Sequence, residues 1–247
     1  MLALLIGASL AHALTGTQVA AQLESWRSQR GIDTAPKIPV SAYQQALNGK
    51  IAKGIEVVED IKAAKGYGVA VFNIPIAQMW KAITDEDHHA NATSVTMSET
   101  IHGPARAHDH VIFQFLDIPM FTDRWWLVNI KYSSGLYTAS SGKLWELTWR
   151  DRNKDTQLVN MLDLTQFDDA MPVAWTKGAW LLMALDDGRT LIEYHTWSDP
   201  GGSVPVGLAT RFAAGEVEQN LKNMARFARQ HTPTCTAQFH HPDGTPL

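Results

Sequence analysis

Alternation of apolar and polar residues dominates the middle of the chain and predicts β-strands. A strand over 124–132 has Trp126 and Ile130 on the same face, because successive side chains of a strand point to opposite sides. Short polar turns such as Asp186-Asp187-Gly188 separate the segments, which favours antiparallel pairing. The predicted strands are 55–61, 67–72, 94–101, 108–116, 124–132, 144–149, 158–164, 174–185 and 189–197.

Helical spacing is found towards both ends of the chain. It predicts a helix over 17–30, which Gly31 ends, a short helical piece over 41–47, and another helix that opens at Pro75. A long final helix is predicted from about 205 to 230. The order of these elements predicts an α+β fold in which a curved antiparallel sheet wraps around the long C-terminal helix. The apolar face of that helix comprises Leu208, Phe212, Val217, Leu221, Met224 and Phe227.

The first residues of the chain resemble a secretory signal. Residues 1–10 are apolar, and Ala11-His12-Ala13 has the small-x-small form of a cleavage site. No basic residue precedes Arg27, so an apolar N-terminal helix is the alternative. We expect residues 1–13 to be a signal peptide and the protein to be periplasmic or secreted, with a cytoplasmic location as the alternative.

Composition narrows the range of functions. The 247 residues carry a formal net charge of −4, which argues against nucleic-acid partners. The single cysteine, Cys235, excludes an intrachain disulfide and a cysteine-rich metal site. The nine tryptophans are unusual. They indicate either a bulky core or a cavity that takes an apolar ligand.

Histidines and acidic residues offer two candidate polar sites. Half of the ten histidines lie between positions 88 and 110. His108 and His110 share a strand face and could bind a metal, but that face is opposite Val111, so we expect a solvent-exposed polar face. Glu193 and His195 could act as general acid and base if they faced inward, whereas the alternation favours an outward polar face. We therefore expect no metal, cofactor or catalytic residue.

Three groups of residues form an ordered pattern along the chain. The first is Pro119 with Asp123-Arg124-Trp125-Trp126, and the second is Gly178-Ala179-Trp180 with Asp187-Gly188-Arg189-Thr190. The third is Tyr194, Asp199-Pro200-Gly201-Gly202, Pro205 and Leu221-Lys222-Asn223-Met224-Ala225-Arg226. Over about residues 50–230 this pattern resembles a START domain, a lipid-transfer module of the helix-grip (SRPBCC, Bet v 1-like) superfamily. The nearest likeness is to the phosphatidylcholine-transfer type.

The resemblance implies a helix-grip fold with an internal hydrophobic cavity, a tunnel between the concave sheet and the C-terminal helix. The implied function is non-enzymatic binding, and transfer, of one lipid or other hydrophobic molecule by a monomer that touches membranes transiently. The alternative is a helix-grip enzyme, similar to a cyclase, aromatase or hydrolase, that acts on a hydrophobic substrate in the same cavity. The implied organisation is a helical extension over 14–49, a START-like lipid-binding domain over 50–231 and a polar tail over 232–247.

The candidate ligand-binding residues combine apolar strand faces with the helix that would close the tunnel. Arg124 could contact a polar group of the ligand, although an ion pair with Asp123 that fixes the 117–122 loop is the better interpretation. Some sterol-binding relatives place a buried carboxylate and guanidinium where Val111 and Ile130 align, so we expect a purely apolar ligand or different polar contacts. The candidates are Val111, Phe113, Phe115, Arg124, Trp126, Val128, Ile130, Trp180, Tyr194, Leu208, Phe212 and Leu221.

Overall fold

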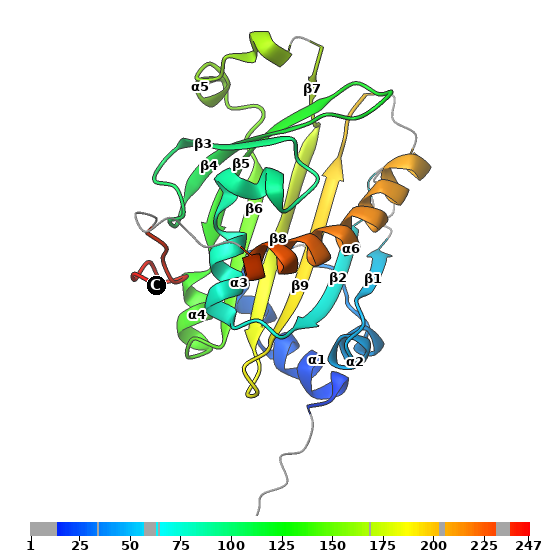
Figure 1. Ribbon diagram of the computed structural model, residues 1–247, viewed down its shortest axis with the longest axis vertical. Coiled ribbons are helices and arrows are strands. Elements are labelled where there is room, and N and C mark those ends of the chain that lie inside the picture. Colours follow the sequence, from blue (N-terminus) through cyan, green and yellow to red (C-terminus); the bar gives the residue numbers. More distant parts are fainter. Residues whose placement is uncertain are drawn as a thin grey trace, which may run out of the picture.

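A curved sheet of nine strands runs through the part of the chain that the structure describes (Figure 1). The predicted signal segment and Cys235 lie outside the described residues, and so do the side chains of 206–215. The computed structural model describes residues 14–33, 35–56, 63, 65–167, 169–202, 206–230 and 238–247.

The sheet is antiparallel except at its shortest strand. Its order is β1-β2-β9-β8-β6-β5-β4-β3, and β7 pairs with β5 in parallel. Most neighbours are consecutive in the chain, as the short turns predict; Gly188, at φ +83°, makes the turn between β8 and β9. The strands are β1 (Ala52–Glu56), β2 (Lys65–Phe72), β3 (Met97–His102), β4 (His110–Leu116), β5 (Arg124–Tyr132), β6 (Leu144–Asp151), β7 (Met171–Pro172), β8 (Trp175–Ala184) and β9 (Thr190–Asp199).

The long helix α6 crosses one face of the sheet and confirms the predicted helix-grip arrangement (Figure 1). It packs on β1, β2 and β9. A Cβ atom at Gly68 would lie 2.6 Å from side-chain atoms of Val217 and Leu221, so a glycine there lets the helix approach β2. No described helix is long and apolar enough to cross a membrane. The helices are α1 (Gly16–Ser25), η1 (Arg27–Gln29), α2 (Val40–Leu47), α3 (Ile76–Ile83), η2 (Glu86–Asn91), α4 (Ser134–Ala139), α5 (Thr156–Val159), η3 (Leu164–Phe167) and α6 (Val206–Gln230).

The strand predicted over 158–164 is wrong. This segment contains the end of α5 and the start of η3. The side chain of Asp155 accepts hydrogen bonds from the backbone N–H groups of Gln157 and Leu158, and such a cap favours a helical turn. The apolar residues of the segment pack against the outer face of β4 and β5 instead of extending the sheet.

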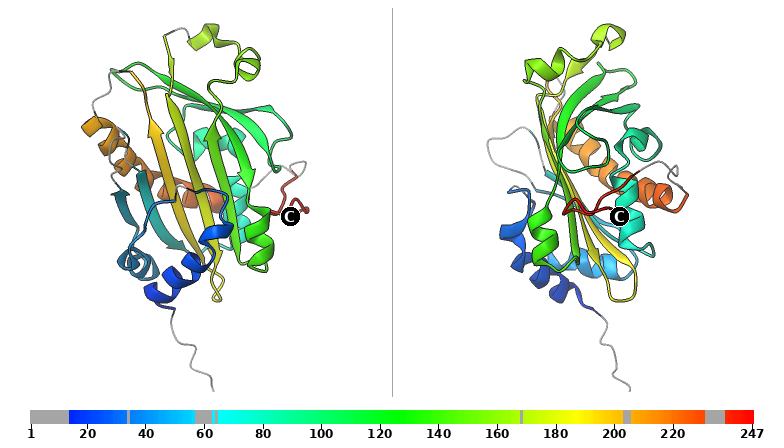
Figure 2. Two further views of the ribbon diagram at one scale, coloured as in Figure 1. Left: turned by 180° about the vertical axis from the view of Figure 1, so that it is seen from behind. Right: turned by 90° about the vertical axis from the view of Figure 1, so that its left-hand side faces the viewer.

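The N-terminal extension covers the face of the sheet that points away from α6 (Figure 2). Val19 on α1 and Tyr43 on α2 share a buried cluster with Leu181 and Leu191 of the sheet. The extension therefore forms one core with the strands. The described C-terminal residues also pack on the fold, because Phe239 is buried and the carbonyl oxygen of His240 accepts a hydrogen bond from the indole of Trp80 (2.8 Å).

Candidate ligand cavity

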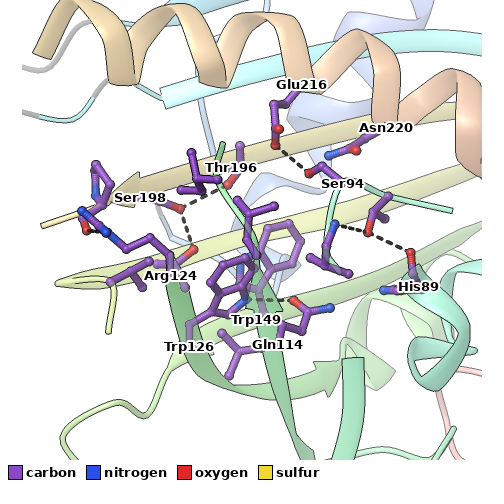
Figure 3. Close-up of a pocket in the computed structure, with 18 of the residues that line it drawn as sticks. His89, Ser94, Gln114, Arg124, Trp126, Trp149, Thr196, Ser198, Glu216 and Asn220 are labelled. Carbon is purple, nitrogen blue, oxygen red and sulfur yellow. Dashed lines mark hydrogen bonds between the residues drawn. The ribbon is translucent and has the colours of Figure 1, made fainter. Parts of the chain in front are cut away.

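A cavity of about 780 Å³ lies between the concave face of the sheet and α6 (Figure 3). Strands β4, β5, β6, β8 and β9 supply about half of the residues that line it, the loop 117–122 lies at one end, and η2 lies at the other. This volume falls within the roughly 300–1,000 Å³ that is usual for a site holding one small molecule. Its apolar wall includes Ile112, Trp126, Val128, Leu147, Trp149 and Trp180.

Half of the predicted ligand-binding residues line this cavity. Leu221, on α6, is fully buried in the main core and is not part of the wall. The side chains of Leu208 and Phe212 lie outside the described residues. The predicted residues that line the cavity are Arg124, Trp126, Val128, Ile130, Trp180 and Tyr194.

The predicted inward face of β4 is wrong. In the sheet, Ile112 pairs with Val128 and Gln114 with Trp126, so the even-numbered residues of β4 share the cavity side of the sheet. Val111, Phe113 and Phe115 face the other way, where they pack in a cluster that includes Phe167 from η3. Both faces of this strand are apolar because both are covered, so alternation alone did not distinguish the inside from the outside.

Because the two faces of β4 are reversed relative to the prediction, the interpretation of the histidines also changes. His110 is on the cavity side of β4 and fully buried, and its Nδ1 lies 2.7 Å from the carbonyl oxygen of Ala107. His89 on η2 is also buried, and its Nε2 lies 3.0 Å from the carbonyl oxygen of Ile83. The expected solvent-exposed face is therefore wrong for His110. Among the described residues, no group of three or more His, Cys, Asp or Glu side chains is arranged to hold a metal ion.

The tryptophans divide between the cavity and the core. Trp126 lines the cavity, and its indole N–H donates to Oε1 of Gln114 (2.8 Å). Trp149 also lines it and stacks on Tyr194, with ring centroids 5.9 Å apart. Trp125 lies on the opposite face, and Trp145 packs in the main core. Both explanations of the tryptophan excess therefore apply to parts of the chain.

Arg124 fixes the mouth of the cavity through main-chain oxygens. Its guanidinium donates to the carbonyl oxygens of Pro200 (2.8 Å) and Asp123 (3.1 Å). The described ion pairs include none with the Asp123 carboxylate, which instead accepts from the N–H of Ile118 (2.9 Å). The predicted ion pair is therefore wrong, although Arg124 does hold the loop. Gly201 follows with φ +69°, a conformation that glycine adopts readily.

Polar side chains occupy a few points along the wall. Glu216 on α6 accepts a hydrogen bond from Ser94 (2.9 Å), and burial raises the pKa of its carboxyl group. Asn220 donates to the hydroxyl of Tyr194 (3.4 Å). Burial raises the pKa of Tyr194 to about 12, so this hydroxyl stays protonated. A largely apolar cavity with few polar groups is suited to binding an apolar molecule.

The candidate acid–base pair lies outside the cavity. Glu193 and His195 are on the outward face of β9, as the alternation predicted, but the N-terminal extension buries them instead of leaving them in solvent. Glu193 accepts a hydrogen bond from Tyr43 (2.6 Å) and pairs with Arg30. Sequence reasoning missed this covering because the apolar faces of the extension do not reveal which surface they contact.

Comparisons with known proteins agree on the architecture. A STAR-related lipid transfer protein from Xanthomonas axonopodis (fragment 25–204) has a TM-score of 0.58 and 17% identity, covering 73% of this chain and 94% of that one. Human STARD10 has a TM-score of 0.58 and 11% identity, covering 85% and 80%. Human StAR-related lipid transfer protein 5 has a TM-score of 0.56 and 11% identity, covering 87% and 97%.

The sequence by itself gives no such match. No family model matches the chain, and no curated protein matches it. The strand order, the position of α6 and the similarity to these solved structures show that this chain has a START-like, helix-grip fold.

Proposed function

We propose that this protein binds one lipid or other largely apolar molecule in the cavity and releases it without chemical change. The observation that carries the proposal is the cavity of about 780 Å³, whose wall includes the rings of Trp126, Trp149 and Trp180. A solid core would have filled this space, since protein interiors are close-packed. The solved structures of similar fold are named for lipid transfer, which supports the same class of ligand.

The described contacts favour binding over catalysis by the pair that the sequence suggested. Glu193 and His195 lie on the far side of the sheet from the cavity, beneath the N-terminal extension. A ligand held between the sheet and α6 therefore cannot reach their side chains. The alternative of a helix-grip enzyme loses the residues on which it was based.

The mouth of the cavity supports transient contact with a membrane. Met120 is 96% exposed and Phe121 is 47% exposed, and both line the cavity in the loop 117–122. Large apolar side chains at the rim of a ligand site indicate an interaction surface. A ligand that leaves here for a bilayer would avoid crossing water.

The location of the protein belongs to the same proposal. Export through the segment 1–13 would place a monomeric carrier in the periplasm or outside the cell, where it would move apolar molecules across an aqueous space. Sequencing the mature N-terminus tests this: cleavage after Ala13 is expected, and an intact Met1 would contradict export.

A cavity-filling substitution tests ligand binding directly. Val128→Trp places a ring inside the cavity, whereas Val40→Trp adds the same ring at an exposed position on α2. Native mass spectrometry, organic extraction and titration with the apolar dye Nile red should show one ligand bound by the wild-type chain and by Val40→Trp. Val128→Trp should lose at least tenfold in affinity while its circular dichroism is unchanged. Equal binding by all three proteins, or by none, would refute the proposal.

A further inference from the structure

The cavity ends although the concave face of the sheet continues. On β5, Val128 and Ile130 line the cavity, but Tyr132, the next residue on the same side, does not. On β6, Leu147 lines it, but Trp145, the next residue on the same side in that direction, does not. Tyr132 and Leu147 are directly opposite each other in the sheet, so both strands stop contributing at nearly the same level. A barrier therefore crosses the concave face there.

Trp80 on α3 forms this barrier. Its side chain is fully buried, and its ring lies edge-on to the rings of Tyr132 (5.0 Å between centroids) and Trp145 (5.6 Å). The same core cluster includes the lining residues Ile130 and Leu147. Helix α3 also packs on α6 and β8. The indole therefore fills the space over the sheet into which the cavity would otherwise continue.

Two hydrogen bonds hold Trp80 in place. Its indole N–H donates to the carbonyl oxygen of His240 (2.8 Å) in the C-terminal segment. Its own carbonyl oxygen accepts a hydrogen bond from the hydroxyl of Thr84 (2.9 Å). A buried indole keeps one orientation when its N–H has a partner and its ring is packed on both neighbours. The barrier is therefore fixed.

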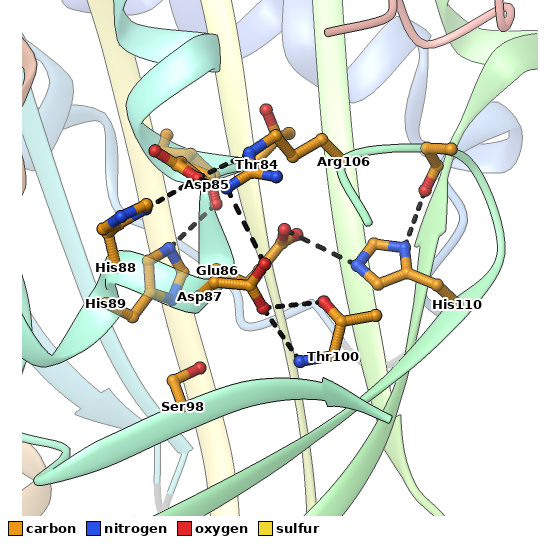
Figure 4. Close-up of polar contacts among 12 residues, drawn as sticks. Thr84, Asp85, Glu86, Asp87, His88, His89, Ser98, Thr100, Arg106 and His110 are labelled. Carbon is orange, nitrogen blue, oxygen red and sulfur yellow. Dashed lines mark hydrogen bonds and ion pairs between the residues drawn. The ribbon is translucent and has the colours of Figure 1, made fainter. Parts of the chain in front are cut away.

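Polar contacts anchor the segment that follows α3 (Figure 4). The carboxylate of Asp85 accepts a hydrogen bond from Nε of Arg106 (2.6 Å). The carboxylate of Asp87 accepts one from the hydroxyl of Thr100 on β3 (2.8 Å). These contacts hold η2, whose Glu86 lines the inner end of the cavity. The end of α3 and the inner end of the cavity are thus attached to the same framework.

We propose that Trp80 closes the inner end of the cavity and so determines the longest apolar chain that the protein can enclose. The inference deepens the proposed function, on which it rests. Protein interiors are close-packed, so a chain that reaches the level of Trp80 cannot extend further without displacing a fixed ring. Any methylene groups beyond that length remain at the mouth, in contact with water.

A series of ligands of increasing length measures this limit. Saturated fatty acids from decanoate to icosanoate, in steps of two carbons, would compete with Nile red for the purified full chain. Burying an unpaired carboxylate is costly, so the carboxylate stays at the mouth and the methyl end enters. Each methylene group that becomes buried should tighten binding about fourfold. The affinity of the wild-type chain should therefore rise with chain length and level off once the methyl end reaches the level of Trp80.

Substitutions of Trp80 complete the test. Trp80→Ala leaves a space at the inner end, so the affinity should level off at acids longer by at least two carbons, and the longest acid should bind at least tenfold more tightly than it binds the wild type. Trp80→Leu keeps an apolar side chain and should give a gain of at least threefold. Trp125→Ala makes the first change at a buried position on the opposite face of β5 and should keep the wild-type limit.

The possible results separate the inference from the function beneath it. Binding of Nile red and of the acids, with the same length limit in the wild type and both Trp80 variants, would refute the role of Trp80 alone. Failure of Nile red and of every acid to bind the wild-type chain would refute the proposed function as well. If neither Trp80 variant folds, the wild-type series still decides, because an affinity that rises to the longest acid without levelling off contradicts a closed inner end.

Discussion

Nη1 of Arg30 lies 2.8 Å from the carboxylate of Glu193, and this contact joins the N-terminal extension to β9. The same guanidinium reaches Glu146 on β6 through Nε (2.7 Å), and all three side chains are buried. Tyr43 completes the group by donating to Glu193. Residues far apart in the sequence thus form one buried network on the outer face of the sheet.

Arg30→Ala should lower the free energy of unfolding substantially. It leaves Glu146 and Glu193 buried without their counter-charge, and breaking such a group costs about 3–5 kcal/mol. The free energy of unfolding in urea measures the loss. Arg150→Ala removes the exposed pair with Asp33 and should cost less than about 1 kcal/mol. Similar losses in the two variants would mean that the network contributes little.

The apolar tip of the loop 117–122 should govern exchange with bilayers. Met120→Asp/Phe121→Asp puts two charges where the proposed membrane contact needs apolar groups, so transfer of a fluorescent lipid to neutral vesicles should slow at least fivefold. Because both side chains also line the cavity, transfer is measured with protein that is already loaded with the lipid. Val40→Asp changes an equally apolar position on α2, at the opposite end of the molecule (Figure 1). If it slows transfer as much, the loop is not the contact.

The sequence predicts the architecture more accurately than it predicts the residues that line the cavity. Alternation on β5 identified Trp126 and Ile130 as residues that line the cavity. On β4 the same method chose the wrong face, because Phe113 packs under the segment 156–167 and looks as apolar as a lining residue. Burial of Glu86 depends on the packing of η2 against β3, a tertiary contact that no local pattern contains.

Arg124→Gln should loosen the mouth of the cavity. The guanidinium links the Asp199-Pro200-Gly201-Gly202 turn to β5 through the carbonyl oxygen of Pro200. Removing a buried donor costs about 1–3 kcal/mol, and we expect the dissociation rate of bound Nile red to rise severalfold. Stopped-flow fluorescence measures this rate. Arg189→Gln, in the exposed β8–β9 turn, should leave it unchanged; an unchanged rate in both variants would show that the mouth does not limit release.

His195, on the outer face of β9, should make the stability of the protein depend on pH. Its side chain is buried, and neither ring nitrogen has a hydrogen-bond partner. Burial, followed by the positive charge of Arg30, holds the pKa of this imidazole well below its ordinary value of 6.5. The folded protein therefore keeps His195 neutral at pH values where the unfolded chain binds a proton. Its contribution to stability is present above pH 6.5 and is lost as the pH falls below that value.

His195→Leu should therefore make the protein less sensitive to acid. Urea unfolding at pH 7 and pH 5 should show a smaller loss of stability than in the wild-type chain. The difference should approach about 1.4 kcal/mol for each pH unit below 6.5, the value for one linked proton. At pH 7 the variant breaks no hydrogen bond of the imidazole. His102→Leu, on an exposed position of β3, should follow the wild-type pH dependence. Parallel losses in the wild type and His195→Leu would mean that other groups set the acid sensitivity.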